Sequence, residues 1–175
     1  ENVLAVKVEG PTKEDYVWGF RVGFMSYAIK GGDDALYDAL SAKTAGAVRG
    51  NISNAANISQ SLLLAAFESE TYAEEKARKF DIMKVRYDAV KEALTDEKYL
   101  TYFEALPYNS GYFMCVKLRQ GVDAEKVRQI LIEKYSIGLI ALGDILRVAF
   151  SAVAASDVKT MFEGIYSACK DASAE

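Results

Sequence analysis

A long stretch without helix-breaking residues limits what this chain can fold into. Between Asn51 and Leu106 there is neither glycine nor proline, whereas all 12 glycines and both prolines of the 175-residue chain lie outside this stretch. Helices can therefore run there without interruption. Apolar side chains recur within it at helical spacing, at Ala73, Ala77, Phe80, Met83, Tyr87, Val90 and Leu94. This pattern predicts one long amphipathic helix, which we expect to connect two domains.

The sequence after this helix predicts a small α+β unit. Residues 112–118, 137–141 and 145–150 are rich in apolar and β-branched side chains, which favours strands. Two helices are predicted between and after them, with Asp123 and Ser156 as their N-caps. Their apolar stripes contain Val127, Ile130 and Leu131, and then Val158, Met161, Phe162, Ile165 and Cys169. We expect a sheet with helices packed on one face, and an α/β fold class for the whole chain.

Composition excludes several classes of function. The chain contains no histidine, so it cannot by itself build a Ser-His-Asp or Cys-His nucleophile system or a histidine-based zinc site. The net charge of −4 comes from segments of mixed sign, which does not favour nucleic acid or anionic lipid as a partner. The longest apolar run, residues 62–67, is far shorter than the roughly 20 residues that cross a bilayer. We expect a cytoplasmic protein, and chemistry on small molecules remains open.

The two cysteines and the first residue allow two further predictions, about the state of the thiols and about the extent of the chain. Cys115 and Cys169 are far apart, in a strand-like and a helix-like run, so we expect buried thiols, with neither a disulfide nor a metal site. The first residue is Glu, and a strand-like run follows at residues 3–8. We expect the chain to be a fragment of a longer protein.

The segment from Gly10 to Phe24, with the sequence GPTKEDYVWGFRVGF, is the most informative one. Lys13 follows a strand that we expect to be buried, and Arg21 lies eight residues later, at the start of another apolar run. An amine can form a Schiff base with an aldehyde, and a guanidinium can bind a phosphate through its planar fork of donors. On spacing alone, the favoured interpretation is a solvated turn lysine and an ordinary arginine at the edge of a strand.

The wider pattern resembles a known signature. From Gly10 to Gly23 the chain is similar to the pyridoxal-phosphate (PLP) attachment segment of class I and II aminotransferases of fold type I: small residue, any residue, small residue, Lys, then Gly-x-Arg-apolar-Gly. Pro11 and Tyr16 depart from it, which leaves the subfamily open. The resemblance implies that Lys13 is the catalytic Schiff-base lysine and that PLP is the cofactor. It also implies that Arg21 and Thr12 bind the cofactor phosphate.

The same resemblance extends to the rest of the chain. It implies that residues 1–70 are the end of the large PLP-binding domain and that residues 71–175 form the small C-terminal domain. The implied protein is a homodimer that transfers an amino group between an amino acid and a 2-oxo acid. The family's aspartate for the pyridine nitrogen and its ring-stacking aromatic precede the lysine, so we expect this fragment alone to be inactive.

Two further arginines are candidates for substrate binding. Arg147 alternates with Leu146 and Val148 out of an apolar strand face. It resembles the family's arginine for the substrate α-carboxylate, and a strand residue that points to solvent is its alternative. Arg49 resembles the arginine of aspartate aminotransferases that reaches the neighbouring subunit's site and pairs with a distal carboxylate. Its alternative is a cation at a helix end, because the usual prolines are replaced by Ala55 and Ala56.

Other interpretations of the sequence stay open or are simpler. A PLP lyase or decarboxylase could use the same residues, since a lysine and arginines do not determine which Cα bond breaks. The PLP- or effector-sensing domain of a transcriptional regulator is a second alternative. We interpret Tyr108 and Tyr112 as structural residues of a turn. The run from Gly31 to Asp34 predicts a turn followed by a helix cap.

Overall fold

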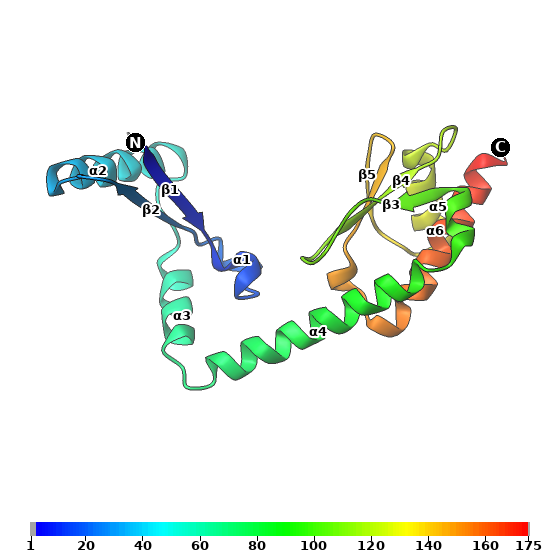
Figure 1. Cartoon of the computed structure of the whole chain (residues 1–175), viewed down its shortest axis with the longest axis horizontal. Coiled ribbons are helices and arrows are strands. Elements are labelled where there is room, and N and C mark those ends of the chain that lie inside the picture. The colour runs from blue at the N-terminus through cyan, green and yellow to red at the C-terminus, as the bar shows by residue number, and fades with distance from the viewer. Residues whose placement is uncertain (1–2, 175) are drawn as a thin grey trace. The chain divides into compact units, whose positions relative to one another are not determined.

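The computed structural model describes residues 3–174, which form two compact units joined through one helix. The first unit ends at Ala77 and the second begins at Arg78. The dividing point lies inside helix α4 (Tyr72–Ala93), which is the long helix predicted from the stretch without glycine and proline (Figure 1). The domain boundary expected between residues 70 and 71 lies just before the start of this helix. Among the described residues, no helix has the length and apolar character needed to span a membrane.

The first unit is a two-stranded ribbon with helices. Its elements in chain order are β1 (Leu4–Glu9), α1 (Pro11–Glu14), the 3-10 helix η1 (Trp18–Phe20), β2 (Phe24–Ile29), α2 (Asp34–Asn51) and α3 (Asn57–Phe67). β1 and β2 pair antiparallel. The Tyr27 hydroxyl lies 2.5 Å from the Thr44 hydroxyl, which links the ribbon to α2. Asp33 caps α2 by accepting a hydrogen bond from the Leu36 N–H at 2.9 Å, so the predicted cap is confirmed.

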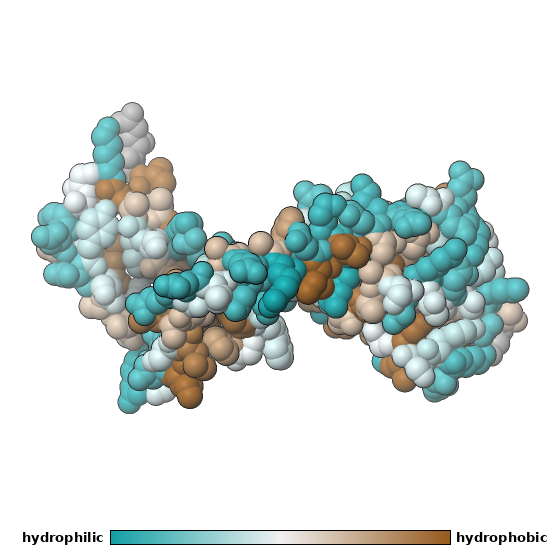
Figure 2. All heavy atoms as spheres, turned by 90° about the horizontal axis from the view of Figure 1, so that it is seen from below, coloured by the Kyte–Doolittle hydropathy of each residue, from teal (hydrophilic) through white to brown (hydrophobic). Residues whose placement is uncertain are grey.

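Most apolar side chains of the first unit are exposed. Among its described residues only Pro11, Val22 and Leu63 are buried. All six residues of β1 are exposed, so the expectation of a buried strand before Lys13 is wrong for this structure. The reason is that β1 has one neighbouring strand, and a ribbon of two strands cannot cover both of its faces. Hydrophobic side chains, shown in brown, are visible at the molecular surface (Figure 2). The first unit therefore leaves much of its apolar surface unburied.

The second unit has its own sheet and core. After α4 come η2 (Glu97–Thr101), β3 (Phe103–Ala105), β4 (Met114–Leu118), α5 (Ala124–Tyr135), β5 (Ile140–Leu142), β6 (Ile145–Val148), η3 (Phe150–Ala152), η4 (Ala155–Asp157) and α6 (Val158–Ser173). The sheet has the order β3-β4-β6-β5, and all its pairs are antiparallel. α5 and α6 pack against each other on one face of this sheet (Figure 1). The predicted α+β unit is confirmed.

Alternation along the strands explains where this core lies. In β4, Met114, Val116 and Leu118 are buried, and in β6, Leu146 and Val148 are buried. These side chains share one face because successive residues of a strand point to opposite sides. They join buried residues of the two helices, including Val127, Leu131, Phe162 and Ile165, in one hydrophobic cluster. The strand residues that alternate with these buried ones point to the opposite face of the sheet.

Several features of the second unit differ from the sequence-based expectation. β3 was not predicted, β4 begins at Met114 and not at residue 112, and β6 ends at Val148 and not at residue 150. The strand expected at residues 137–141 begins only at Ile140, as β5, because the residues before it complete the C-terminal end of α5. Ser136 adopts a left-handed conformation there, and the Ile137 N–H donates to the Leu131 carbonyl at 3.0 Å. Ser156 does not cap α6. It lies within η4, its hydroxyl bonds to the Asp157 carboxylate at 2.9 Å, and α6 begins without a side-chain cap. The Asp123 cap on α5 is confirmed, with the Lys126 N–H at 2.7 Å.

The two cysteines differ in their surroundings. Cys169 is fully buried in α6, as predicted, and burial raises the pKa of its thiol to about 12. Cys115 is only half-buried, because it lies on the face of the sheet that α5 and α6 do not cover. The expectation of a buried thiol is therefore wrong for Cys115.

Candidate active site

Residues 10–23 form a closed loop between the two strands of the first unit. Glu9 and Phe24 are the last paired residues of β1 and β2, so the chain leaves and re-enters the ribbon at the same point. Two glycines face each other there. A Cβ at Gly10 would lie 3.2 Å from the Val22 carbonyl oxygen, and one at Gly23 would lie 3.4 Å from the Glu9 carbonyl oxygen. Glycine therefore permits the close approach of the two backbones that closes the loop.

Thr12 and Lys13 lie on a single helical turn at the start of this loop. Pro11 occupies the first turn of α1, where its missing N–H has no cost, and it is buried. The turn closes when the Asp15 N–H donates to the Pro11 carbonyl at 3.0 Å. Thr12 is half-buried and Lys13 is exposed. The lysine thus extends from a short helix with a buried base.

Arg21 lies at the other end of the loop, in a strained backbone conformation. Its φ angle is 53°, and Tyr16 in the same loop has a φ angle of 61°. Left-handed conformations of this kind cost residues other than glycine about 1–3 kcal/mol, and they concentrate at functional sites. The Arg21 guanidinium donates to the Trp18 carbonyl at 3.5 Å, and the side chain is exposed. The loop therefore carries an amine, a hydroxyl and a guanidinium, a donor set that suits an anionic aldehyde such as PLP.

One acidic residue of this loop, Asp15, was not among the residues predicted from the sequence. The Asp15 carboxylate accepts hydrogen bonds from Tyr72 and Lys76, both on α4. These partners lie 57 and 61 residues away along the chain, so no local pattern reveals them. A pocket of about 210 Å³ adjoins the cluster and is lined by Gly10, Pro11, Asp15, Tyr72 and Lys76 among others. Thr12, Lys13 and Arg21 are not among the residues that line it.

Arg147 lies on the uncovered face of the sheet in the second unit. It is half-buried, and its neighbours along β6, Leu146 and Val148, are buried on the opposite face. Its guanidinium carbon lies 4.7 Å from the centre of the Phe113 ring, which is a cation–π distance. Cys115 of β4 is its partner across the sheet. The sequence-based prediction did not include Phe113, although its alternation with Cys115 places both on this face.

Arg49 lies in the last turn of α2, in the first unit. Its Nη1 donates to the Ser53 hydroxyl at 2.6 Å, and the side chain is exposed. A cation at this position interacts favourably with the carbonyl end of the helix. The structure thus gives Arg49 a local partner, which agrees with its interpretation as a helix-end cation.

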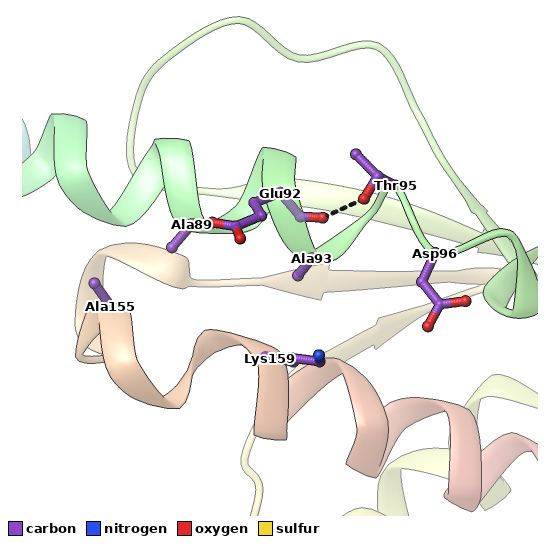
Figure 3. Close-up of a pocket in the computed structure, with 7 residues that line it drawn as sticks. All are labelled: Ala89, Glu92, Ala93, Thr95, Asp96, Ala155 and Lys159. Carbon is purple, nitrogen blue, oxygen red and sulfur yellow. Dashed lines mark hydrogen bonds between the residues drawn. The ribbon is translucent and has the colours of Figure 1, made fainter.

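A further pocket lies between α4 and the start of α6. It has a volume of about 370 Å³ and is lined by Ala89, Glu92, Ala93, Thr95, Asp96, Ala155 and Lys159. Figure 3 shows the Glu92 and Asp96 carboxylates and the Lys159 amine at its wall, together with the hydrogen bond from Thr95 to the Glu92 carbonyl. None of the predicted site residues lines this pocket. Opposite charges at a solvent-accessible wall are ordinary surface structure, and we assign no chemistry to it.

Comparisons with known proteins identify the fold. No protein-family model and no curated protein sequence matches the chain. Among solved structures, it is similar to an aminotransferase from Anaerococcus prevotii, with a TM-score of 0.72 and 21% identity over 92% of this chain. It is also similar to the α-aminoadipate aminotransferase LysN from Thermus thermophilus, with a TM-score of 0.67 and 18% identity over 89% of the chain. It is similar as well to an aromatic aminotransferase from Pyrococcus horikoshii, with a TM-score of 0.68 and 13% identity over 95% of the chain.

These matches cover only part of each larger protein. The chain spans 38% of the Anaerococcus protein, 39% of LysN and 43% of the Pyrococcus protein. Identities of this size show a shared fold and no more. The chain has the mixed α/β fold of the corresponding part of these aminotransferases.

Proposed function

We propose that this chain forms the C-terminal part of a PLP-dependent aminotransferase that transfers an amino group between an amino acid and a 2-oxo acid. The observation that carries the proposal is the loop of residues 10–23. It holds Lys13 and Arg21 in the order of the attachment signature, within a fold that aminotransferases share over most of this chain. The LysN structure contains N-(5'-phosphopyridoxyl)-L-leucine, a PLP derivative, which supports the choice of cofactor.

In this proposal the loop residues have distinct roles. The Lys13 amine would hold the cofactor covalently, and as a free amine it would move the proton at the substrate Cα. The Arg21 guanidinium pairs with the cofactor phosphate through its planar fork, and the Thr12 hydroxyl donates to the same group. PLP, when bound, supplies an electron-withdrawing ring that makes the substrate α-proton acidic. The strained backbone at Arg21 supports a functional position for its side chain.

The substrate is held by arginines in this proposal. Arg147 binds the α-carboxylate, because its guanidinium lies on an uncovered sheet face and is packed on the Phe113 ring. Arg49 pairs with the distal carboxylate of a dicarboxylic substrate such as aspartate, in exchange for its bond to Ser53. The complete enzyme is a homodimer. The exposed apolar side chains of the first unit support burial of this surface in a larger assembly.

Mapping of the covalent link to PLP tests the role of Lys13. The protein that carries this chain is incubated with PLP, reduced with borohydride and digested for peptide mapping. We expect the label on Lys13, and we expect Lys13→Ala to lose it while the circular dichroism spectrum stays unchanged, because an exposed lysine contributes little to stability. Lys43→Ala, which changes an exposed lysine of α2, is the matched control and should keep the label. A labelled peptide without Lys13 would overturn the assignment.

A further inference from the structure

One carboxylate of the Lys13 loop is withdrawn from solvent. The Asp15 side chain is 10% exposed, whereas the side chain of the preceding residue, Glu14, is 67% exposed. Its Oδ1 atom accepts a hydrogen bond from the Tyr72 hydroxyl and another from the Lys76 Nζ atom, the latter at 2.9 Å. Both donors lie one turn apart at the start of α4, on the same face of the helix.

The two donors also support each other. Lys76 Nζ donates to the Tyr72 hydroxyl oxygen at 3.3 Å and lies 5.5 Å from the centre of the Tyr72 ring. That ring packs edge-on against Phe67, with 5.3 Å between the ring centres. The hydrogen bond to Asp15 raises the pKa of Lys76 and also that of Tyr72. At neutral pH the carboxylate therefore meets one cation and one neutral hydroxyl, a favourable combination.

The buried residues of the loop lie near its closed end. They are Pro11 and Val22, close to the two facing glycines. Between them the backbone passes through the left-handed positions Tyr16 and Arg21, which persist only where surrounding contacts hold them. Asp15 adjoins the first of these positions and lies two residues from Lys13. Its bonds to α4 therefore act on the part of the loop that burial does not fix.

We propose that Asp15 is a positioning residue, which fastens the Lys13 loop to the start of α4 through Tyr72 and Lys76 and so fixes where Lys13 presents its amine. The effect on Lys13 rests on the function proposed above, whereas the attachment to α4 rests only on the contacts described. Charge-assisted hydrogen bonds to a largely buried carboxylate are stronger than bonds between exposed neutral groups.

Hydrogen exchange of the full chain tests the attachment. Asp15→Asn and Lys76→Met should each accelerate exchange of amides in residues 10–23 by about tenfold or more, because each removes a charged hydrogen bond that holds the loop closed. The double variant should exchange no faster than Asp15→Asn alone, because Asp15 is the acceptor that Lys76 shares with Tyr72. Glu14→Gln is the matched control, since its carboxylate lies 3.8 Å from Lys76 but is exposed, and it should have little effect. Amides of α5 report that the second unit stays folded. Unchanged exchange in Asp15→Asn would overturn the proposal.

Covalent labelling by PLP and borohydride then tests the effect on Lys13. The measured quantity is the ratio of label on Lys13 to label on Lys43. We expect Asp15→Asn to lower this ratio and Lys76→Arg, which keeps the cation, to preserve it. Faster exchange with an unchanged ratio would show that the attachment does not position Lys13. Equal labelling of the two lysines in the unaltered protein would contradict the proposed function itself, while the exchange result would still judge the attachment to α4.

Discussion

At the scale of single residues, the chemistry of this chain depends on what each charged side chain contacts. Lys13 and Arg21 belong to one loop, which two facing glycines close. Arg147 packs on the Phe113 ring, on the sheet face opposite the core. The sequence pattern singled out these cations as candidates, but it singled out neither the Asp15 carboxylate, which bonds to α4, nor the aromatic ring that contacts Arg147.

Substitution of the arginines separates their proposed roles. Arg147→Ala should impair turnover of every amino acid, whereas Arg49→Ala should impair only aspartate and glutamate, because only these carry a distal carboxylate. Loss of one charged, hydrogen-bonded contact costs about 2 to 5 kcal/mol. Phe113→Leu should raise KM for all amino acids and change kcat less, since it leaves the guanidinium present but less well oriented. Equal losses on neutral and acidic substrates in Arg49→Ala would refute the dicarboxylate role.

At the scale of elements, an ion pair joins η2 to α6 in the second unit. Lys98 Nζ lies 2.5 Å from the Glu163 carboxylate, and the Tyr99 hydroxyl donates to the same oxygen at 2.9 Å. These donors hold the pKa of Glu163 below its ordinary value of 4.5, with Lys98 as the larger cause. A depressed carboxylate pKa contributes stability that is complete above the ordinary value and is lost as the pH falls through the folded-state value.

Acid should therefore destabilise this unit through Glu163. We expect the melting temperature to decrease when the pH is lowered below about 4.5. The decrease should be smaller in Glu163→Gln, because the amide has no charge to lose. The effect should be modest because both partners are partly exposed and screened by solvent. Lys98→Met should reduce the acid sensitivity in the same way. Thermal melts followed by circular dichroism at pH 7 and at pH 4 measure this decrease in melting temperature. Equal decreases in the unaltered protein, Glu163→Gln and Lys98→Met would contradict the role of Glu163.

At the scale of the whole molecule, the two units differ in how completely they bury their apolar side chains. In the second unit one cluster runs from Val90 to Ala172 and contains fully buried Phe103, Phe150 and Phe162. In the first unit, Val8 and Trp18 are 72% and 69% exposed. We therefore expect the second unit to fold independently and the first unit to be unstable when it is alone.

Separate expression of the two units tests this difference. A polypeptide of residues 78–175 should unfold in one cooperative transition, because its hydrophobic cluster lies within it. A polypeptide of residues 1–77 should show no such transition and should bind a hydrophobic dye. Circular dichroism melts and dye fluorescence measure the two properties. A cooperative transition in residues 1–77 without dye binding would show that the exposed apolar surface is not a source of instability.

The sequence by itself determined the local structure: the long helix α4, the caps at Asp33 and Asp123, and the alternation that places Arg147 opposite the core. Periodicity and capping depend on neighbours a few residues apart, so a sequence contains them directly. Tertiary structure alone decided the exposure of β1 and the contact of Asp15 with α4. These features depend on which distant segments meet, because burial and charge pairing arise only once the chain has folded.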